Sequence, residues 1–383
     1  MHRQLLSLMP WLQAVSVVVC QANGQPLMVG PAPSSRPAAT VPVAGAQAGP
    51  ASGIDPRRVY FNDPDALYNR QAEVSFEIVA DLLDRFRPQL PEPRERKTAL
   101  LLLDGIFHEP WAPKRPAVQA FHHQRISQAA KEITGSPPSQ GALIWKLYDH
   151  AFVVRTPTVT LAFDLTRGNS AGAEGFAVSD EVVARIVDQC DVLFISHPHG
   201  DHADEWVAGR FIEQGKPVVA TPELWPGKDL TAKITIPRRQ AHVRQPLPLA
   251  NGGRSLDVVA YPGHQGNLPN NVVLVFTPEG LSFCHTGDQA NGSDFEWIDK
   301  VAEHHRVDVL MPNCWTPEIA RVVRGVNPAI VITGHENELG HSIDHREAYW
   351  LTYDRTTDCN RPVLIMTWGE SYRYSPIHRS RVH

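Results

Sequence analysis

The chain has 383 residues and a formal net charge of -5, with 20% charged and 42% hydrophobic residues. These values are ordinary for a globular protein and exclude wholesale disorder. The mild acidity argues against a protein that binds the nucleic-acid backbone, which needs a basic surface, so we expect no nucleic-acid partner. Five cysteines are too few to build a disulfide scaffold in a chain of this length.

Residues 1–22 are typical of an export signal peptide. A weakly basic start precedes a mostly apolar run from Leu5 to Cys20, and a small-residue cleavage site follows. The run is shorter than the ~20 apolar residues that cross a bilayer and Pro10 interrupts it, so we expect no transmembrane span. We therefore expect an exported protein, periplasmic or secreted. The alternatives are a cytoplasmic protein with a buried N-terminal helix and a lipid anchor at Cys20.

The next two segments precede the main domain. Residues 23–57 predict a Pro/Ala-rich linker, because they show no helix or strand period. Residues 58–138 predict a helical extension, in which Asp63-Pro64 has the pattern of an N-cap followed by proline at the first helical position. We expect the extension to cover the domain that follows. Its predicted apolar stripe contains Ile78, Leu82 and Phe86, with Val79 and Leu83 beside them.

From Gly141 the pattern changes to short β-branched strands separated by turns and helices. This alternation predicts an α/β protein in which two sheets pack together with helices outside, an αββα sandwich over residues 139–383. Strands are expected at Ala142–Leu147, Phe152–Phe163, Asp191–Ile195, Pro217–Ala220, Ser255–Tyr261, Asn271–Phe276, Leu281–His285, Val307–Met311, Ala329–Thr333 and Val363–Thr367. Helices are expected at Ser179–Cys190, Asp294–His304 and Ser342–Thr352.

The most informative segment directly follows the strand expected at Asp191–Ile195. It places four metal-binding side chains within six residues: His197, His199, Asp201 and His202. In extended geometry residues two apart point the same way, and Gly200 allows a sharp turn that brings the last two donors to a second position. Imidazole and carboxylate ligands suit Zn²⁺, and also Mn²⁺ or Fe²⁺. The segment therefore predicts a metal site.

Three later strand ends supply one more donor each, and a glycine lies beside each donor. They are Pro262-Gly263-His264, Thr286-Gly287-Asp288 and Gly334-His335. A single histidine or aspartate at a strand end is usually structural, but three of them after a four-donor loop are better explained as one pocket. His242 competes with His264 as third ligand, although it does not end a strand.

This set of motifs, HxHxDH with a further Asp204, then PGH, TGD and GH, resembles the metallo-β-lactamase superfamily over roughly Gly141 to Thr367. The resemblance implies two divalent metal ions, which we expect to be Zn²⁺. It implies that one ion is held by His197, His199 and His264, and the other by Asp201, His202 and His335. Asp288 would bridge the two ions. The HxHxDHxD form looks most like the ascorbate-phosphate lactonase and acyl-ethanolamine phospholipase D branches.

The resemblance implies a hydrolase acting on an ester, lactone or phosphodiester, in a small-molecule or lipid-like substrate. Two nearby cations lower the pKa of a shared water, and the resulting metal-bound hydroxide attacks a carbonyl carbon or phosphorus. We expect Asp201 to be catalytic, because it can orient this hydroxide as well as bind metal. His341, six residues after His335, is a candidate substrate contact. Cys284 and Cys314 are expected to pack in the core.

Other functions stay open. A nuclease-type phosphodiesterase is disfavoured by the net charge and by the lack of a basic, aromatic-interleaved segment. A β-lactamase is less favoured because those enzymes commonly carry cysteine where this chain has Asp288. A non-catalytic metal-binding envelope protein is the third alternative, but no ligand is missing. Oxygen-reducing di-iron members of the superfamily replace the second histidine of the first motif by glutamate, and His199 argues against that class.

Overall fold

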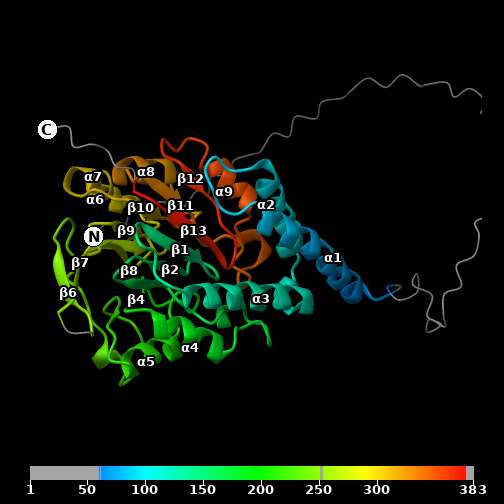
Figure 1. Ribbon diagram of the computed structural model, residues 1–383, viewed down its shortest axis with the longest axis horizontal. Helices are drawn as coiled ribbons and strands as arrows, with labels where there is room; N and C mark the ends of the chain where they lie inside the picture. The colour runs from blue at the N-terminus through cyan, green and yellow to red at the C-terminus, as the bar shows by residue number, and fades with distance from the viewer. Residues whose placement is uncertain (1–59, 61, 251–252, 377–383) are drawn as a thin grey trace, which may run out of the picture. The chain divides into compact units, whose positions relative to one another are not determined.

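The computed structural model describes residue 60, residues 62–250 and residues 253–376 (Figure 1). The expected signal peptide and the whole of the expected linker lie outside these residues, so both stay predictions. Within the described ranges, no helix combines the length and the apolar character needed to cross a membrane. The described residues all belong to one compact unit, which contains the helical extension as well as the sandwich.

The first sheet has six strands in the order β13-β1-β2-β3-β4-β5. It begins as an antiparallel meander, and β3, β4 and β5 then run parallel to one another. Short apolar strands of this kind suit a sheet that is covered on both faces. The strands are β1 (Ala142–Lys146), β2 (Phe152–Arg155), β3 (Thr160–Phe163), β4 (Val192–Phe194), β5 (Val218–Val219) and β13 (Glu370–Tyr374).

The second sheet has seven strands in the order β12-β11-β10-β9-β8-β7-β6. Strands β9 to β12 are parallel, whereas β6 to β9 form antiparallel pairs. The strands are β6 (Gln245–Pro248), β7 (Ser255–Gln265), β8 (Leu268–Phe276), β9 (Ser282–His285), β10 (Val309–Met311), β11 (Ile330–Ile332) and β12 (Val363–Leu364).

The two sheets bury a common apolar core, and helices cover their outer faces. The inner core joins Phe152 and Phe163 of the first sheet to Phe283 and Met311 of the second. The expected αββα sandwich is therefore confirmed. Helices α1 to α5 pack with the first sheet and α6 to α8 with the second. The helices that follow the helical extension along the chain are α4 (Asp180–Gln189), α5 (Glu205–Glu213), α6 (Phe295–Ile298), α7 (Val301–His304), α8 (Ile319–Val326) and α9 (Tyr349–Arg355).

The helical extension consists of α1 (Pro64–Arg85), α2 (Arg94–Phe107) and α3 (Pro116–Ile133). Asp63 caps α1, since its side chain accepts a hydrogen bond from the amide of Ala66 at 2.9 Å, as expected. The three helices share one core with the first sheet, so the extension covers the sandwich, as expected (Figure 1).

The expected apolar stripe of α1 is wrong in one respect. Ile78 is 54% exposed, and Phe86 lies beyond the helix end at Arg85. The buried face instead follows Ala72, Phe76, Val79 and Leu83. The reason is the stacking of Phe76 on Phe121 of α3, with ring centroids 4.3 Å apart, which fixes the rotation of α1 about its axis.

Two expected helices differ in the structure. Ser342–Thr352 contains a short 3₁₀ turn at Ile343–His345, and α9 starts only at Tyr349. Buried Asp104 of α2 sets this start, because its carboxylate accepts the amides of Tyr349 and Trp350 at 2.8 and 3.0 Å. Asp294–His304 divides into α6 and α7.

Candidate metal centre

The donors of the predicted site lie at the carboxyl ends of strands from both sheets. Strands β3 and β4 are parallel, as are β9, β10 and β11, so within each sheet these ends meet at one edge. The loop after β4 carries His197 to His202, and the turns after β9 and β11 carry Asp288 and His335. The fold thereby brings together side chains that are more than a hundred residues apart in the sequence.

Glycines make these turns possible. Gly287 has a left-handed backbone with φ of +51°, and a Cβ there would collide with Asn270 and Ser196. A Cβ at Gly334 would collide with the ring of His150. Both positions therefore need glycine so that the backbone beside Asp288 and His335 can approach the first sheet.

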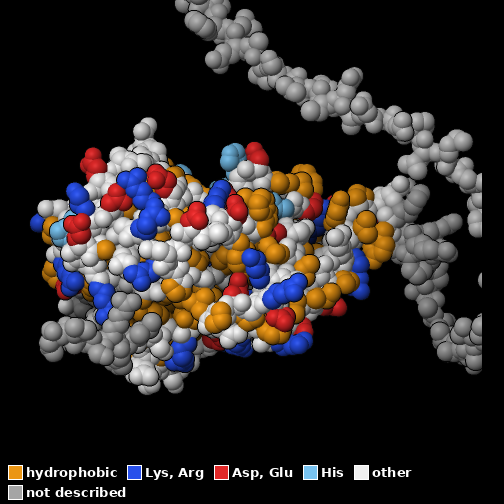
Figure 2. All heavy atoms as spheres, turned by 90° about the horizontal axis from the view of Figure 1, so that it is seen from above, with side chains coloured by type: hydrophobic (Ala, Val, Ile, Leu, Met, Phe, Trp, Pro, Cys, Tyr) orange, Lys and Arg blue, Asp and Glu red, His pale blue; other side chains and the backbone are white. Residues whose placement is uncertain are grey.

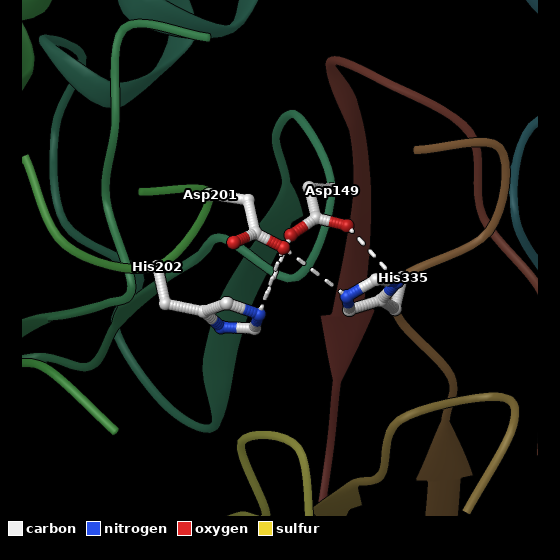
Figure 3. A group of neighbouring side chains, drawn as sticks. All are labelled: Asp149, Asp201, His202 and His335. Atoms are coloured by element: carbon white, nitrogen blue, oxygen red, sulfur yellow. Dashed lines mark ion pairs between the residues drawn. The ribbon is translucent and has the colours of Figure 1, made fainter. Parts of the chain in front are cut away.

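One group of buried donors consists of Asp149, Asp201, His202 and His335, whose ligand atoms all lie within 4.8 Å of one another (Figure 3). The Oδ2 atom of Asp201 lies 3.3 Å from Nε2 of His202 and 3.4 Å from Nε2 of His335. Ligands placed about 2.1 Å from a tetrahedral ion are themselves about 3.4 Å apart. The spacing of these atoms therefore suits a divalent metal ion.

A second group shares His202 and adds His197 and Asp288. Asp288 lies between the two groups, because its Oδ2 is 3.6 Å from Nε2 of His197 and 3.3 Å from Nε2 of His202. Its other oxygen, Oδ1, lies 3.6 Å from Nε2 of His335. This central position is the one that a bridging carboxylate would need.

The nitrogen atoms that face the centre have no hydrogen-bond partner among the described residues. They are Nε2 of His197, His202 and His335, and all three are buried. Buried polar atoms are normally paired, so three such ring nitrogens facing carboxylates fit the ligands of a divalent cation. The donor set of imidazoles and carboxylates fits a divalent transition metal.

Electrostatics support the same interpretation. Burial alone would raise the pKa of Asp201 and Asp288, but the nearby His202 and His335 hold the pKa of both carboxyls well below the ordinary range. Burial would likewise lower the pKa of His202, yet Asp288, Asp201 and Asp164 raise it well above the ordinary value. The low pKa of both carboxyls favours the ionised form that binds a metal ion.

Residues outside the donor group hold the donors in place. Nδ1 of His202 donates to Asp164 at 2.7 Å, which leaves Nε2 facing the centre. Asp288 accepts hydrogen bonds from Asn313 at 2.7 Å and Gln265 at 3.0 Å. These contacts fix the rotamers of His202, which both groups share, and of Asp288, which lies between them.

Three of the expected site residues lie outside the two groups. His199 is exposed, with its ring centroid 4.6 Å from that of His197. His264 is 39% exposed, and its Nδ1 lies 2.8 Å from Asp294, so only its Nε2 remains free to bind an ion. The assignment of both as ligands stays a prediction. His341 stacks on His335 with centroids 5.5 Å apart, beside the centre. The alternative ligand His242 stacks on His304, at 4.0 Å.

Sequence reasoning missed several residues of the centre. Asp149 and His150 occupy the β1–β2 turn, and Asp164 directly follows β3. A signal existed for Asp164, because an acidic residue ends the apolar strand Thr160–Phe163 next to the strand that precedes the histidine loop. No such signal marks Asp149 and His150, because the position of their turn beside the second sheet follows only from the pairing of β1 with β2.

Other polar and sulfur side chains near the motifs have structural roles. Asp204 caps α5 by accepting the amides of Trp206 and Val207, and it pairs with Arg167 at 2.9 Å. Cys284 and Cys314 are buried and unpaired, as expected for core residues. Burial raises the pKa of Cys284 to about 12, so no thiolate is present at neutral pH.

No protein-family model matches the chain, and no curated protein matches it in sequence. Solved structures do match. Igni18, a metallo hydrolase from Ignicoccus hospitalis, is 16% identical over 62% of this chain and 100% of its own, with a TM-score of 0.46. CmlA, a diiron β-hydroxylase from Streptomyces venezuelae, is 15% identical over 62% of this chain and 55% of its own, with a TM-score of 0.46.

A zinc-dependent hydrolase of the metallo-β-lactamase superfamily from Thermotoga maritima is 16% identical over 51% of this chain and 76% of its own, with a TM-score of 0.29. At such identities and TM-scores the likeness says nothing about substrate or metal, so the chemistry has to be inferred from the donor groups of this chain.

Proposed function

We propose that the protein is a metal-dependent hydrolase that uses two divalent ions to cleave an ester, lactone or phosphodiester. The observation that carries this proposal is the convergence of unpaired nitrogens from His197, His202 and His335 on the carboxylates of Asp201 and Asp288. Two ions bound by these residues would supply a metal-bound hydroxide near neutral pH. Zn²⁺, Mn²⁺ and Fe²⁺ all suit the donor set as a whole.

The residues of the chain have separate tasks in this proposal. Asp288 joins the two ion positions because it faces His197 on one side and His202 with His335 on the other. Asp201 combines a negative charge with a place in the loop between exposed His199 and buried His202, so one of its oxygens would hold metal while the carboxylate would also orient the attacking water. No side chain nucleophile is needed, and the buried thiol of Cys284 is not available as one.

The substrate side of the centre is the side of the more exposed rings. His199 and His264 reach solvent, and partly exposed His341 stacks on His335. Trp315 packs its ring edge-on against His335, with centroids 5.8 Å apart, and is itself partly exposed. The indole of Trp315 and the neighbouring imidazoles beside an ion site favour a substrate with an apolar portion next to the scissile group. We therefore propose a small-molecule or amphiphilic, lipid-like substrate, with His341 as a substrate contact.

A panel of substrates tests the proposal. Purified protein is loaded separately with Zn²⁺, Mn²⁺ and Fe²⁺, and hydrolysis of lactones, acyl esters, small and lipid phosphodiesters, β-lactams and nucleic acid is measured. We expect turnover of an ester, lactone or phosphodiester that is lost with a chelator and restored by metal. Cleavage of nucleic acid or β-lactams alone would favour the alternative enzymes. If the protein binds two ions and hydrolyses none of these compounds, the proposed function is wrong.

A further inference from the structure

Asp149 is a buried acidic residue whose ion pairs, with His202 and His335, are made to side chains of the candidate metal centre. It lies in the tight turn between β1 and β2, with a left-handed φ of +56°, where glycine would be favoured. Its side chain is fully buried, and neither carboxylate oxygen has a hydrogen-bond partner among the described residues. A buried carboxylate without a hydrogen bond costs stability, so a cation that uses the carboxylate is the natural explanation.

The carboxylate of Asp149 points at the donor group (Figure 3). Its Oδ2 lies 3.7 Å from Nε2 of His202, and its Oδ1 lies 3.3 Å from Nδ1 of His335. The first distance is close to the spacing between two ligands of one ion. The backbone keeps the turn in place, because the carbonyl oxygen of Asp149 accepts the amide of His335 at 3.0 Å.

We propose that Asp149 is an additional ligand of the ion held by Asp201, His202 and His335, and that it shifts the preference of this position from Zn²⁺ towards Mn²⁺ and Fe²⁺. This inference rests on the proposed function for the existence of the site. With Asp288, the position has three carboxylates and two imidazoles. Zn²⁺ favours four ligands and accepts nitrogen and sulfur readily, whereas a larger, oxygen-rich set suits Mn²⁺.

The two ion positions would then differ in metal preference. The position next to His197 has histidine neighbours, since His199 lies against His197 and the resemblance adds His264. The position next to Asp149 is richer in carboxylate. A protein loaded with mixed metals would therefore place Zn²⁺ at the first position more readily than at the second.

The test compares Asp149→Asn and Asp149→Gly with the wild-type chain. Asparagine keeps the shape and tolerates a left-handed backbone, whereas glycine removes both the carboxylate and the backbone strain. Asp308→Asn is the matched control, because Asp308 is a buried carboxylate, 1% exposed, at the start of β10 and thus at the opposite end of that strand from the site. Chelator-treated proteins are titrated with Mn²⁺ and with Zn²⁺ against an indicator, and bound Mn²⁺ is counted by electron paramagnetic resonance.

We expect both Asp149 variants to bind the second Mn²⁺ at least about tenfold more weakly, while Zn²⁺ affinity changes less. The ratio of the Mn²⁺ to the Zn²⁺ dissociation constant should therefore rise, and Asp308→Asn should leave it unchanged.

Wild-type Mn²⁺ affinity in Asp149→Asn and Asp149→Gly would overturn the inference, as would an equal loss of Mn²⁺ and Zn²⁺. Failure of the inference is distinguishable from failure of the proposed function. If the wild-type protein hydrolyses a substrate and both variants keep two ions, only the inference is wrong. If the variants lose one ion and the fully loaded wild type hydrolyses nothing, only the proposed function is wrong.

Discussion

Nδ1 of His202 donates a hydrogen bond to Oδ2 of Asp164 over 2.7 Å, and both residues are fully buried. Asp164 also accepts the amide and the hydroxyl of Ser196, each at 2.7 Å, so its carboxylate cannot turn away. The contact therefore selects the tautomer and the orientation in which Nε2 of His202 faces Asp201 and Asp288. In this way a residue outside both donor groups determines how the shared histidine is oriented towards them.

Replacing Asp164 by asparagine should weaken binding of divalent metal by about 10- to 100-fold. Asparagine tolerates the left-handed φ of +45° at this position, so the backbone is not the cause of the loss. Its amide group no longer holds His202 by a charged hydrogen bond. The measurement is a chelator competition with the metal-free protein. Unchanged metal affinity in a folded Asp164→Asn protein would show that Ser196 and the packing alone orient His202.

Asp288→Asn should lower the occupancy of both ion positions, unlike a change in any donor that faces one position. The reason is its central place, 3.6 Å from His197 and 3.3 Å from His202. Metal content per chain, measured by elemental analysis after dialysis with excess Mn²⁺ and Zn²⁺, checks this. We expect close to two ions in the wild-type protein. Loss of one ion only from the variant would assign Asp288 to a single position.

Asp201→Asn should reduce turnover on the order of 100-fold or more even when metal is saturating, because it removes the charge that orients the attacking water. Cys284→Ser serves as the matched control. The Cys284 thiol is buried with a pKa raised to about 12 and takes no part in the chemistry, so this variant should keep its activity. An inactive Cys284→Ser protein with full metal content, or a trapped covalent adduct, would contradict hydrolysis by activated water.

Much of the fold and the centre of the site could be predicted from the sequence, because the signals were local. A donor loop after a buried strand and three donors beside glycines need no knowledge of distant contacts. The strands Val192–Phe194 and Ile330–Ile332 lie within the expected segments, since continuous β-branched runs are unambiguous. The donors His197, Asp201, His202, Asp288 and His335 then meet because parallel strands place their carboxyl ends at a common edge.

The remaining features depend on contacts that no local pattern encodes. Asp149 lies in a turn, and its importance follows from the approach of His335 across two sheets. Ile78 and Phe76 both fit an apolar helix face, and only the stacking of Phe76 on Phe121 decides which one is buried. The start of α9 at Tyr349 depends on Asp104, which lies in another helix.

Buried His122 should make the protein sensitive to acid. It stacks on Phe176 with centroids 4.4 Å apart, and burial lowers its pKa to about 3 from an ordinary 6.5. Between these values the unfolded chain binds a proton that the folded chain does not. This residue therefore removes stability as pH falls from 6.5 towards 3, by about 1.4 kcal/mol per pH unit.

The His122→Phe variant keeps the aromatic stack but has no titrating group, so its unfolding free energy should fall less steeply over the same pH range. Urea unfolding at pH 4, 5, 6 and 7 provides the comparison. Only the slopes matter, because loss of the contact between Nδ1 and the Phe176 carbonyl, 3.1 Å long, lowers stability at every pH. Parallel pH curves for the two proteins would show that His122 becomes protonated in the folded state.

The buried pair Arg96–Glu370 should anchor the helical extension to the sandwich. Arg96 of α2 is fully buried and binds Glu370 of β13 through two contacts of 2.6 Å, while its Nη2 also donates to the carbonyl of Ile365 at 2.8 Å. Arg96→Ala should cost about 3–5 kcal/mol, because the buried Glu370 charge is then left with only the Thr367 amide at 2.9 Å and the more distant Arg125 at 3.9 Å.

Arg96→Met combined with Glu370→Gln should recover much of that loss, since the buried Glu370 charge is then removed together with its partner and apolar volume replaces the guanidinium stem. Urea unfolding of the metal-free proteins measures both changes and separates them from effects on the ion site. Near-additive losses in the double variant would mean that the two residues stabilise the protein through other contacts. Recovery would show that the extension is held by this charge pair as well as by the apolar core that Phe76, Phe107 and Phe121 share with Trp368.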